Sequence, residues 1–112
     1  MYVKDGFYEY PIVQRRIVGK KFPINGGGYV RLMAWGPIRR AIFRHIKKSD
    51  GYMFYVHPFE ISTKEFPKFK GLGFLNGMFI NRGRKSYLKK IKIIVNKLKQ
   101  EGYEFKTMGE HV

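Results

Sequence analysis

The chain has 112 residues, a length that predicts a single domain over residues 1–112, and its 44% hydrophobic and 17% aromatic content excludes a wholly disordered polypeptide. It carries 23 Lys plus Arg against 8 Asp plus Glu, a formal net charge of +15, which predicts attraction to nucleic acid, acidic glycans or anionic membrane surfaces without choosing among them. The absence of cysteine excludes disulfides, thiolate metal sites and cysteine nucleophiles.

Extended structure is expected in the first quarter of the chain. Residues 7–13 are rich in aromatic and β-branched side chains, which is typical of a strand, and Pro11 favours an edge position. Residues 14–24 are expected to be extended with a turn at Gly19. Residues 25–28 read Asn-Gly-Gly-Gly and predict a loop, because glycine adopts backbone angles that other residues avoid.

The middle of the chain predicts a helix followed by a buried strand. Pro37 suits the first position of a helix, and apolar residues at helical spacing continue until Gly51 ends it. Residues 52–56 are almost wholly apolar, which indicates a short strand buried on both faces, as in a parallel sheet. Helix, turn and buried strand in this order form the unit of an α/β fold.

Residues 63–81 mix Phe, Pro, Gly and Lys and are expected to be irregular. Within them, residues 70–77 partly resemble the RNA-recognition signature, which works through aromatic rings that stack on bases. Leu72 and Gly77 stand at two of the aromatic positions, so the segment is interpreted as a loop.

A second long helix is expected near the C-terminus. Ser86 is a suitable N-cap, the apolar residues that follow share one face, lysines occupy much of the rest, and Gly102 ends the helix. Residues 103–106 predict a last short strand. The expected architecture is therefore α/β, a short sheet with two main helices.

His57 directly follows the predicted buried strand. Functional groups gather at the carboxyl ends of strands in α/β folds, and an imidazole that titrates near neutrality can act as general acid or base. Position alone favours the simpler interpretation, a histidine satisfied by backbone hydrogen bonds. Glu60 could orient His57 or face solvent. The histidines at 45, 57 and 111 have no metal-ligand spacing, so no metal site is predicted in this chain.

Residues 26–32 (GGGYVRL) are the second candidate segment. Glycine lets backbone N–H groups approach a ligand, Tyr29 could stack on a sugar ring, and Arg31 could donate paired hydrogen bonds to a carboxylate or to hydroxyls. The simpler interpretation is a flexible turn followed by a surface arginine. The spacing fits neither a phosphate-binding loop nor a dinucleotide fingerprint.

Taken together, residues 26–32 and residues 54–60 (FYVHPFE) resemble the C-terminal region of polysaccharide deacetylases of the type found in exopolysaccharide gene clusters. That pattern usually has Phe where Val30 stands and Trp where Phe59 stands, and both replacements keep apolar character. The resemblance runs from about residue 8 to about residue 108 and includes the lysine-rich last helix.

The resemblance implies the C-terminal part of a distorted (β/α) barrel that hydrolyses N-acetyl groups of amino sugars in a polysaccharide or oligosaccharide. In such enzymes a divalent metal, usually zinc, activates water, an Asp acts as base, and a late His protonates the departing amine. The match places the late His at His57, with Glu60 supporting it. The residues that would line or close the substrate groove are Gly27, Gly28, Tyr29, Arg31 and Phe59.

The metal ligands of that family have no counterpart in this sequence. No Asp-Asp pair and no His-x-x-x-His segment is present, so the zinc site and the base are expected on an N-terminal half that lies elsewhere. The chain is accordingly expected to be inactive alone. Because a partial barrel exposes strand edges, it is expected to pair with that half, to self-associate, or to close its short sheet with the terminal helix.

Two other functions stay open at this point. The charge of +15 favours a stand-alone basic module that binds nucleic acid or an acidic glycan, and an inactive relic of an enzyme is also compatible with the sequence. The pair of motifs is more specific than charge, so the deacetylase is preferred and nucleic acid is the less favoured partner.

No stretch of about 18 consecutive apolar residues is present, so no membrane span is predicted. The first six residues lack the apolar core of a signal peptide, which makes a cytoplasmic location the default expectation. A signal on a segment upstream of residue 1 would change that expectation.

Overall fold

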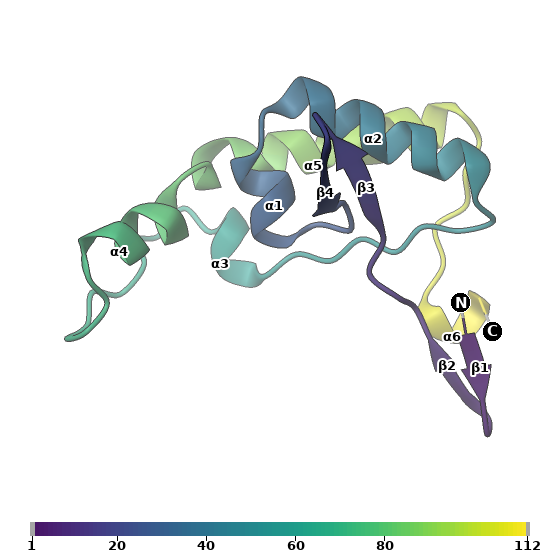
Figure 1. Ribbon diagram of the computed structural model, residues 1–112, viewed down its shortest axis with the longest axis horizontal. Helices are drawn as coiled ribbons and strands as arrows, with labels where there is room; N and C mark the ends of the chain where they lie inside the picture. Colours follow the sequence, from purple (N-terminus) through teal and green to yellow (C-terminus); the bar gives the residue numbers. More distant parts are fainter. Residues whose placement is uncertain (1, 112) are drawn as a thin grey trace.

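Two long helices and two short hairpins make up the structure, a computed structural model that describes residues 2–111 apart from the side chain of His111. The elements in chain order are β1 (Tyr2–Lys4), β2 (Phe7–Glu9), β3 (Gln14–Ile17), β4 (Lys20–Pro23), α1 (Gly27–Leu32), α2 (Trp35–Lys48), α3 (Pro58–Ile61), α4 (Phe74–Asn81), α5 (Arg84–Gln100) and α6 (Met108–His111). The helices α2 and α5 form the body, α4 projects at one end, and the β1–β2 hairpin lies with α6 at the other (Figure 1).

Both sheets of the described chain are two-stranded antiparallel hairpins. Strand β1 pairs with β2, and β3 pairs with β4 so that Gln14 faces Pro23. The predicted turn at Gly19 is confirmed, and Gly19 has a φ of 79°, which glycine adopts without steric penalty. The strand expected over residues 7–13 is shorter than predicted, because pairing stops at Glu9, before Pro11.

Helix α1 replaces the loop that was predicted at residues 25–28. Gly26 remains outside the helix with a φ of 124°, and the helix starts at Gly27. Val30 is completely buried in the core cluster. The two glycines within it, Gly27 and Gly28, argue against a helix on local propensity, so the burial of this short helix against the core outweighs that preference.

The segment 52–56 is not the doubly buried strand that the sequence predicted. It is half-buried and makes one parallel bridge, between Gly26 and Tyr55, in which the Tyr55 amide donates to the Asn25 carbonyl at 2.8 Å. Only one backbone segment of the described chain pairs with it, so the row of parallel neighbours that would make it a central strand is missing. The mixed helix–strand class is confirmed, but part of a barrel is not visible in the described residues.

The two predicted main helices are confirmed as α2 and α5. Helix α2 begins two residues before Pro37, which still occupies the first turn, where a missing N–H is tolerated. Helix α5 begins at Arg84, so the prediction of Ser86 as N-cap is wrong. Gly83 is the N-cap in a left-handed conformation, and the Ser86 hydroxyl donates to its carbonyl at 3.2 Å.

Two C-terminal predictions are corrected. Residues 74–81, expected to be irregular, form α4, which buries none of its side chains. Its apolar residues are spread around the helix, so the one-sided stripe by which an amphipathic helix is recognised is missing. Residues 103–106, expected to be a strand, have no regular secondary structure, and no strand of the described chain pairs with them.

The core lies between α2, α5 and the β3–β4 hairpin. It consists of apolar side chains that are at least nine-tenths buried: Ile17, Ile24, Val30, Ile38, Ile42, Phe43, Ile46, Ile94 and Leu98. The helical members follow the three- and four-residue spacing that places side chains on one face. None of the helices in the described part of the chain has the length and apolar character that a bilayer crossing needs.

His45 is a buried polar residue on α2. The Arg15 guanidinium lies 2.6 Å from its Nδ1, and the Tyr52 ring packs edge-on at 5.9 Å between centroids. Burial, followed by the positive charge of Arg15, lowers the pKa of His45 below its ordinary value of 6.5. At neutral pH the ring is therefore neutral and can accept a hydrogen bond from Arg15.

Stability is expected to fall when His45 becomes protonated. The unfolded chain binds this proton at a higher pH than the folded chain. The stability that neutral His45 contributes is therefore fully present above about pH 6.5 and is lost as pH falls through the lowered pKa. Thermal unfolding between about pH 7.5 and pH 5 measures this loss. His45→Gln keeps an acceptor for Arg15 and should flatten the profile; an unchanged slope would contradict the assignment.

Candidate functional site

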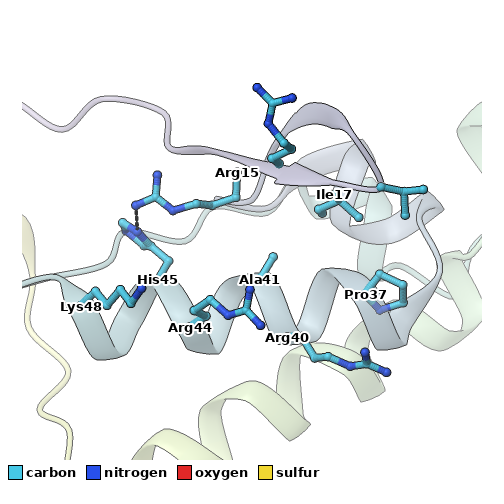
Figure 2. Close-up of a pocket in the computed structure, with 10 residues that line it drawn as sticks. Arg15, Ile17, Pro37, Arg40, Ala41, Arg44, His45 and Lys48 are labelled. Atoms are coloured by element: carbon cyan, nitrogen blue, oxygen red, sulfur yellow. Dashed lines mark hydrogen bonds between the residues drawn. The ribbon is translucent and has the colours of Figure 1, made fainter.

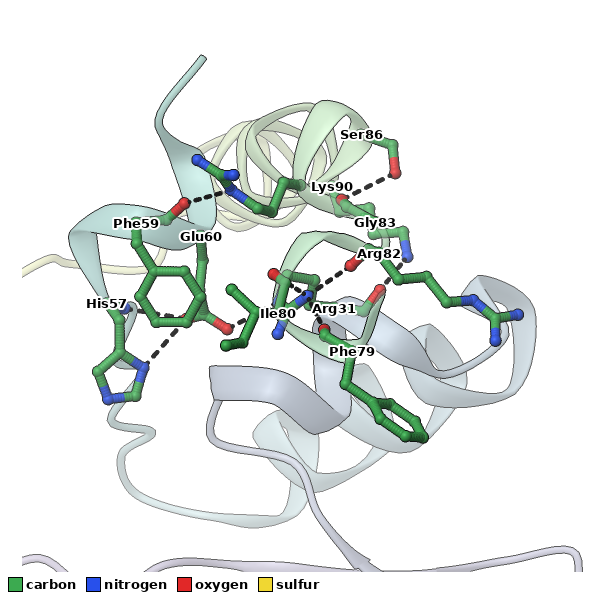
Figure 3. Close-up of polar contacts among 11 residues, drawn as sticks. Arg31, His57, Phe59, Glu60, Phe79, Ile80, Arg82, Gly83, Ser86 and Lys90 are labelled. Atoms are coloured by element: carbon green, nitrogen blue, oxygen red, sulfur yellow. Dashed lines mark hydrogen bonds and ion pairs between the residues drawn. The ribbon is translucent and has the colours of Figure 1, made fainter. Parts of the chain in front are cut away.

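His57 stands at the N-terminus of α3 with its ring in solvent. Its side chain is 57% exposed, whereas Glu60, three residues later, is 1% exposed. Glu60 Oε2 accepts a hydrogen bond from the His57 backbone N–H at 2.9 Å and lies 3.2 Å from the ring Nδ1. Glu60 therefore fixes the ring by one nitrogen and leaves Nε2 for another partner (Figure 3).

Arg31 forms a buried ion pair with Glu60. Its Nε donates to Glu60 Oε1 at 3.0 Å, and the two side chains are 5% and 1% exposed. Its Nη1 donates to the carbonyls of Phe79 and Ile80 at 2.9 and 3.0 Å, and also to the carbonyl of Arg82. These carbonyls end α4 and have no partner within the helix. Arg31 therefore neutralises Glu60 and caps α4 at the same time.

Arg84 caps the carbonyl end of α3, as Arg31 caps that of α4. Its Nε donates to the Phe59 carbonyl at 2.7 Å, and its Nη2 donates to the carbonyls of Ser62 and Lys64 at 3.1 and 2.6 Å. Arg84 is 9% exposed. The turn that follows His57 is thus fixed to α5 through charged hydrogen bonds, which are stronger than neutral ones.

The connection between α4 and α5 lies directly on α1. A Cβ at Gly83 would be 2.7 Å from the Arg31 carbonyl oxygen, so only glycine fits. The Lys90 ammonium donates to that same carbonyl at 3.2 Å, and burial lowers the pKa of Lys90. The carbonyl ends of α1, α3 and α4 therefore each receive a cation from within the fold.

Aromatic rings flank the imidazole. Phe59 stacks on His57 with 5.9 Å between centroids and 28° between planes, and Tyr55 meets His57 edge-on at 5.6 Å. The Arg31 guanidinium lies 5.7 Å from the centre of the Phe59 ring. The group formed by His57, Glu60, Arg31, Phe59 and Tyr55 is named the His57 site. It places an exposed imidazole beside two aromatic rings, which are side chains of the kind that line ligand sites.

The glycine segment is only partly assembled around this site. A Cβ at Gly27 would lie 2.7 Å from the Tyr55 hydroxyl, so the lack of a side chain serves packing against Tyr55. Gly28 is half-buried beside Arg31. Tyr29 is 49% exposed, and its ring lies 6.2 Å from Phe22. Substrate contact by Gly27, Gly28 and Tyr29 stays a prediction.

Arg31 occupies a different place from the one expected of it. A surface arginine that reaches substrate would be exposed, but this side chain is almost wholly buried and its donors point at Glu60 and at the end of α4. A buried guanidinium is tolerated here because it has an acidic partner and backbone carbonyls to which it can donate. Arg31 is therefore a positioning residue for Glu60.

Two residues that support the site had no signal of function in the sequence. Asn25 is 1% exposed; its amide donates to the Met53 carbonyl at 2.6 Å, and its side-chain oxygen accepts from the Val13 N–H.

Tyr87 is completely buried under the site. Its hydroxyl makes no hydrogen bond of ordinary geometry, although the Gly27 amide is near enough to lower its pKa. Burial, then the charge of Glu60, raise that pKa overall, so Tyr87 stays uncharged.

The site contains no metal-binding set. Over residues 2–111, no group of three His, Asp or Glu side chains is arranged to hold an ion. A zinc ion therefore does not fit the described residues, and the chemistry of this chain is derived from the imidazole and its supporting groups alone.

These features define a small mixed helix–strand domain in which a buried Arg–Glu pair supports an exposed histidine. The sequence profile of the family described as "Domain of unknown function (DUF3473)" matches residues 2–112. Because this match spans nearly the whole chain, the protein belongs to that family. No curated protein and no solved structure gives a significant match.

Proposed function

We propose that this chain is the C-terminal region of a polysaccharide deacetylase, in which His57 donates a proton during removal of N-acetyl groups from amino sugars. The pair of motifs at residues 26–32 and 54–60 supports this proposal. The observation that carries it is geometric: a buried Glu60, held by Arg31, fixes one nitrogen of an exposed imidazole.

The reaction needs a proton at the nitrogen that leaves. Water adds to the amide carbonyl, the C–N bond breaks, and acetate and a free amine result only if the nitrogen gains a proton as it departs. The protonated His57 ring supplies it from Nε2, while Nδ1–H donates to Glu60. The carboxylate stabilises the imidazolium before transfer and keeps Nδ1 protonated afterwards. Arg31 pairs with the carboxylate in its buried position at 3.0 Å.

The neighbouring rings suit a sugar. Phe59 lies parallel to the imidazole, so a sugar ring stacked beside Phe59 would bring its acetamido group within reach of Nε2. Tyr29, which is 49% exposed on α1, would offer a second ring to an oligosaccharide. The substrate is accordingly a chain of N-acetylated sugars.

The remaining catalytic groups must come from another segment or chain. Zinc and the base that activates water would belong to a metal-binding deacetylase half, with which this domain pairs. Apolar side chains exposed at both ends of the molecule support such pairing: Phe74, Leu75 and Phe79 on α4, and Phe7 on the β1–β2 hairpin, are each more than half exposed (Figure 1). A second copy of this chain is the other candidate partner for these surfaces.

Activity assays on the joined polypeptide test the proposal. With zinc and an N-acetylated oligosaccharide, activity is expected from a polypeptide that carries a metal-binding deacetylase half together with this chain, and not from this chain alone. His57→Ala should lower kcat by about 100-fold, the usual effect of removing a general acid. Lys99→Ala, at an exposed position of α5, serves as control. Full activity in a folded His57→Ala variant would refute the role of His57.

A further inference from the structure

A shallow groove between β3 and α2 is lined by basic side chains that the His57 site does not use. Its volume is about 510 Å³. Five cationic side chains line it, and no acidic residue does: Arg15 and Arg16 come from β3, and Arg40, Arg44 and Lys48 come from α2 (Figure 2). This surface is named the β3–α2 groove.

The cations of α2 form a straight row. Arg40, Arg44 and Lys48 are spaced by four residues, which places them on one face of the helix. At a rise of about 1.5 Å per residue, neighbours in the row stand roughly 6 Å apart. Like charges at this spacing destabilise a helix, and no ion pair in the described part of the chain involves the row. A bound anion would reduce this repulsion between the cations of the row.

Arg15 is held in place on the opposite wall. Its Nη2 lies 2.6 Å from Nδ1 of the neutral His45, and its Nη1 donates to the Gln14 carbonyl at 3.0 Å. Neither partner carries a negative charge, so the guanidinium keeps its full charge for a ligand. Fixing a charged side chain beforehand reduces the conformational entropy lost on binding.

The residues of the groove that carry no charge help to distinguish between nucleic acid and an acidic glycan as its ligand. Apolar residues also line the groove: Ile17 on β3, Val18 in the turn that follows β3, and Pro37 and Ala41 on α2. Among the lining residues the one aromatic ring is His45, which is 7% exposed and bound by Arg15, so nucleic-acid bases would find little stacking surface. A sugar acid fits better, because its C–H face can cover the apolar residues while its carboxylate accepts paired hydrogen bonds from arginine.

We infer that the β3–α2 groove binds a segment of an anionic glycan, whose carboxylates pair with Arg40 and Arg44 on one wall and Arg15 on the other. The ligand class is a chain of uronic acids. This inference does not rest on the proposed deacetylase function, because the groove lies outside the His57 site and binding requires no second half.

Calorimetric titration of the chain with an oligogalacturonate of roughly four to six sugars tests the inference. Binding is expected, and a neutral N-acetylglucosamine oligomer of equal length should not compete for the groove. Arg40→Gln/Arg44→Gln should weaken oligogalacturonate binding by about 10-fold or more, because two charge-assisted contacts are lost. Lys92→Gln/Lys99→Gln removes the same net charge from exposed positions of α5 and should weaken it by less than about 3-fold.

Three results would overturn the inference. Equal weakening by the two double variants would mean that the net charge of +15, and not the groove, attracts the glycan. Tighter binding of a single-stranded oligonucleotide of equal charge would assign the groove to nucleic acid. Absence of oligogalacturonate binding at low ionic strength, where charge contacts are strongest, would remove the ligand class altogether. Circular dichroism of each variant separates these outcomes from misfolding.

Discussion

Replacing Arg31 with methionine is expected to lower the free energy of unfolding by about 3–5 kcal/mol, because it leaves the buried Glu60 carboxylate without its counter-charge. The variant also removes the hydrogen bonds that end α4, at the carbonyls of Phe79 and Ile80. Methionine fills most of the arginine volume, so the loss reports charge and hydrogen bonding more than packing. Urea denaturation followed by tryptophan fluorescence of Trp35 measures it.

Two further variants make this result interpretable. Arg82→Met removes an arginine whose side chain is exposed and should change stability by less than about 0.5 kcal/mol. Arg31→Met/Glu60→Leu removes both charges and should recover part of the loss, since a buried ion pair can be replaced by apolar side chains at little net effect. An Arg31→Met variant as stable as Arg82→Met would show that the pair is not buried in solution.

Replacing Gly26 with alanine is expected to destabilise the fold by about 3 kcal/mol or more, through steric overlap and a backbone conformation that only glycine adopts easily. Gly26 has a φ of 124°, and a Cβ there would lie 2.0 Å from the Tyr55 carbonyl oxygen. This overlap can be removed only if the bridge between Gly26 and Tyr55 opens. Because His57 follows Tyr55 by two residues, the imidazole should also lose its position.

Gly36 provides the matched control. It lies in the first turn of α2, and nothing comes within 4 Å of a Cβ placed on it. Gly36→Ala should therefore stabilise the protein by about 0.5–1 kcal/mol through the better helix propensity of alanine. The same chemical change is expected to have opposite signs at the two glycines in thermal unfolding. Equal effects would contradict the close approach at Gly26.

Local patterns were sufficient for some elements and insufficient for others. Helices α2 and α5 follow from their apolar periodicity, and the β3–β4 hairpin follows from the turn at Gly19. Helix α1 could not be predicted in this way, because its glycines disfavour a helix locally and only contacts with distant segments stabilise it. The segment 52–56 has the composition of a central strand, but the number of strands that pair with it is not a local property.

The candidate site divides in the same way. The spacing of His57 and Glu60 allowed their contact to be considered from sequence, whereas the burial of Arg31 depends on the end of α4, 48 residues away. Arg84, which fixes α3 and the turn after it to α5, was not predicted as a site residue. One signal was available: Arg84 precedes the buried Tyr87 by three residues, a spacing that places both on the inner face of α5.

The dependence of activity on the leaving group tests the role of His57 most directly. The polypeptide that joins this chain to a metal-binding deacetylase half would be assayed, as wild type and as His57→Ala, on an N-acetylglucosamine oligomer and on an aryl acetate ester. A general acid matters for an amine, which cannot leave unprotonated, and hardly for a phenolate. The account predicts a loss of about 100-fold in kcat on the oligomer and less than about 3-fold on the ester. Equal losses on both substrates, or an undiminished rate on the oligomer, would contradict it.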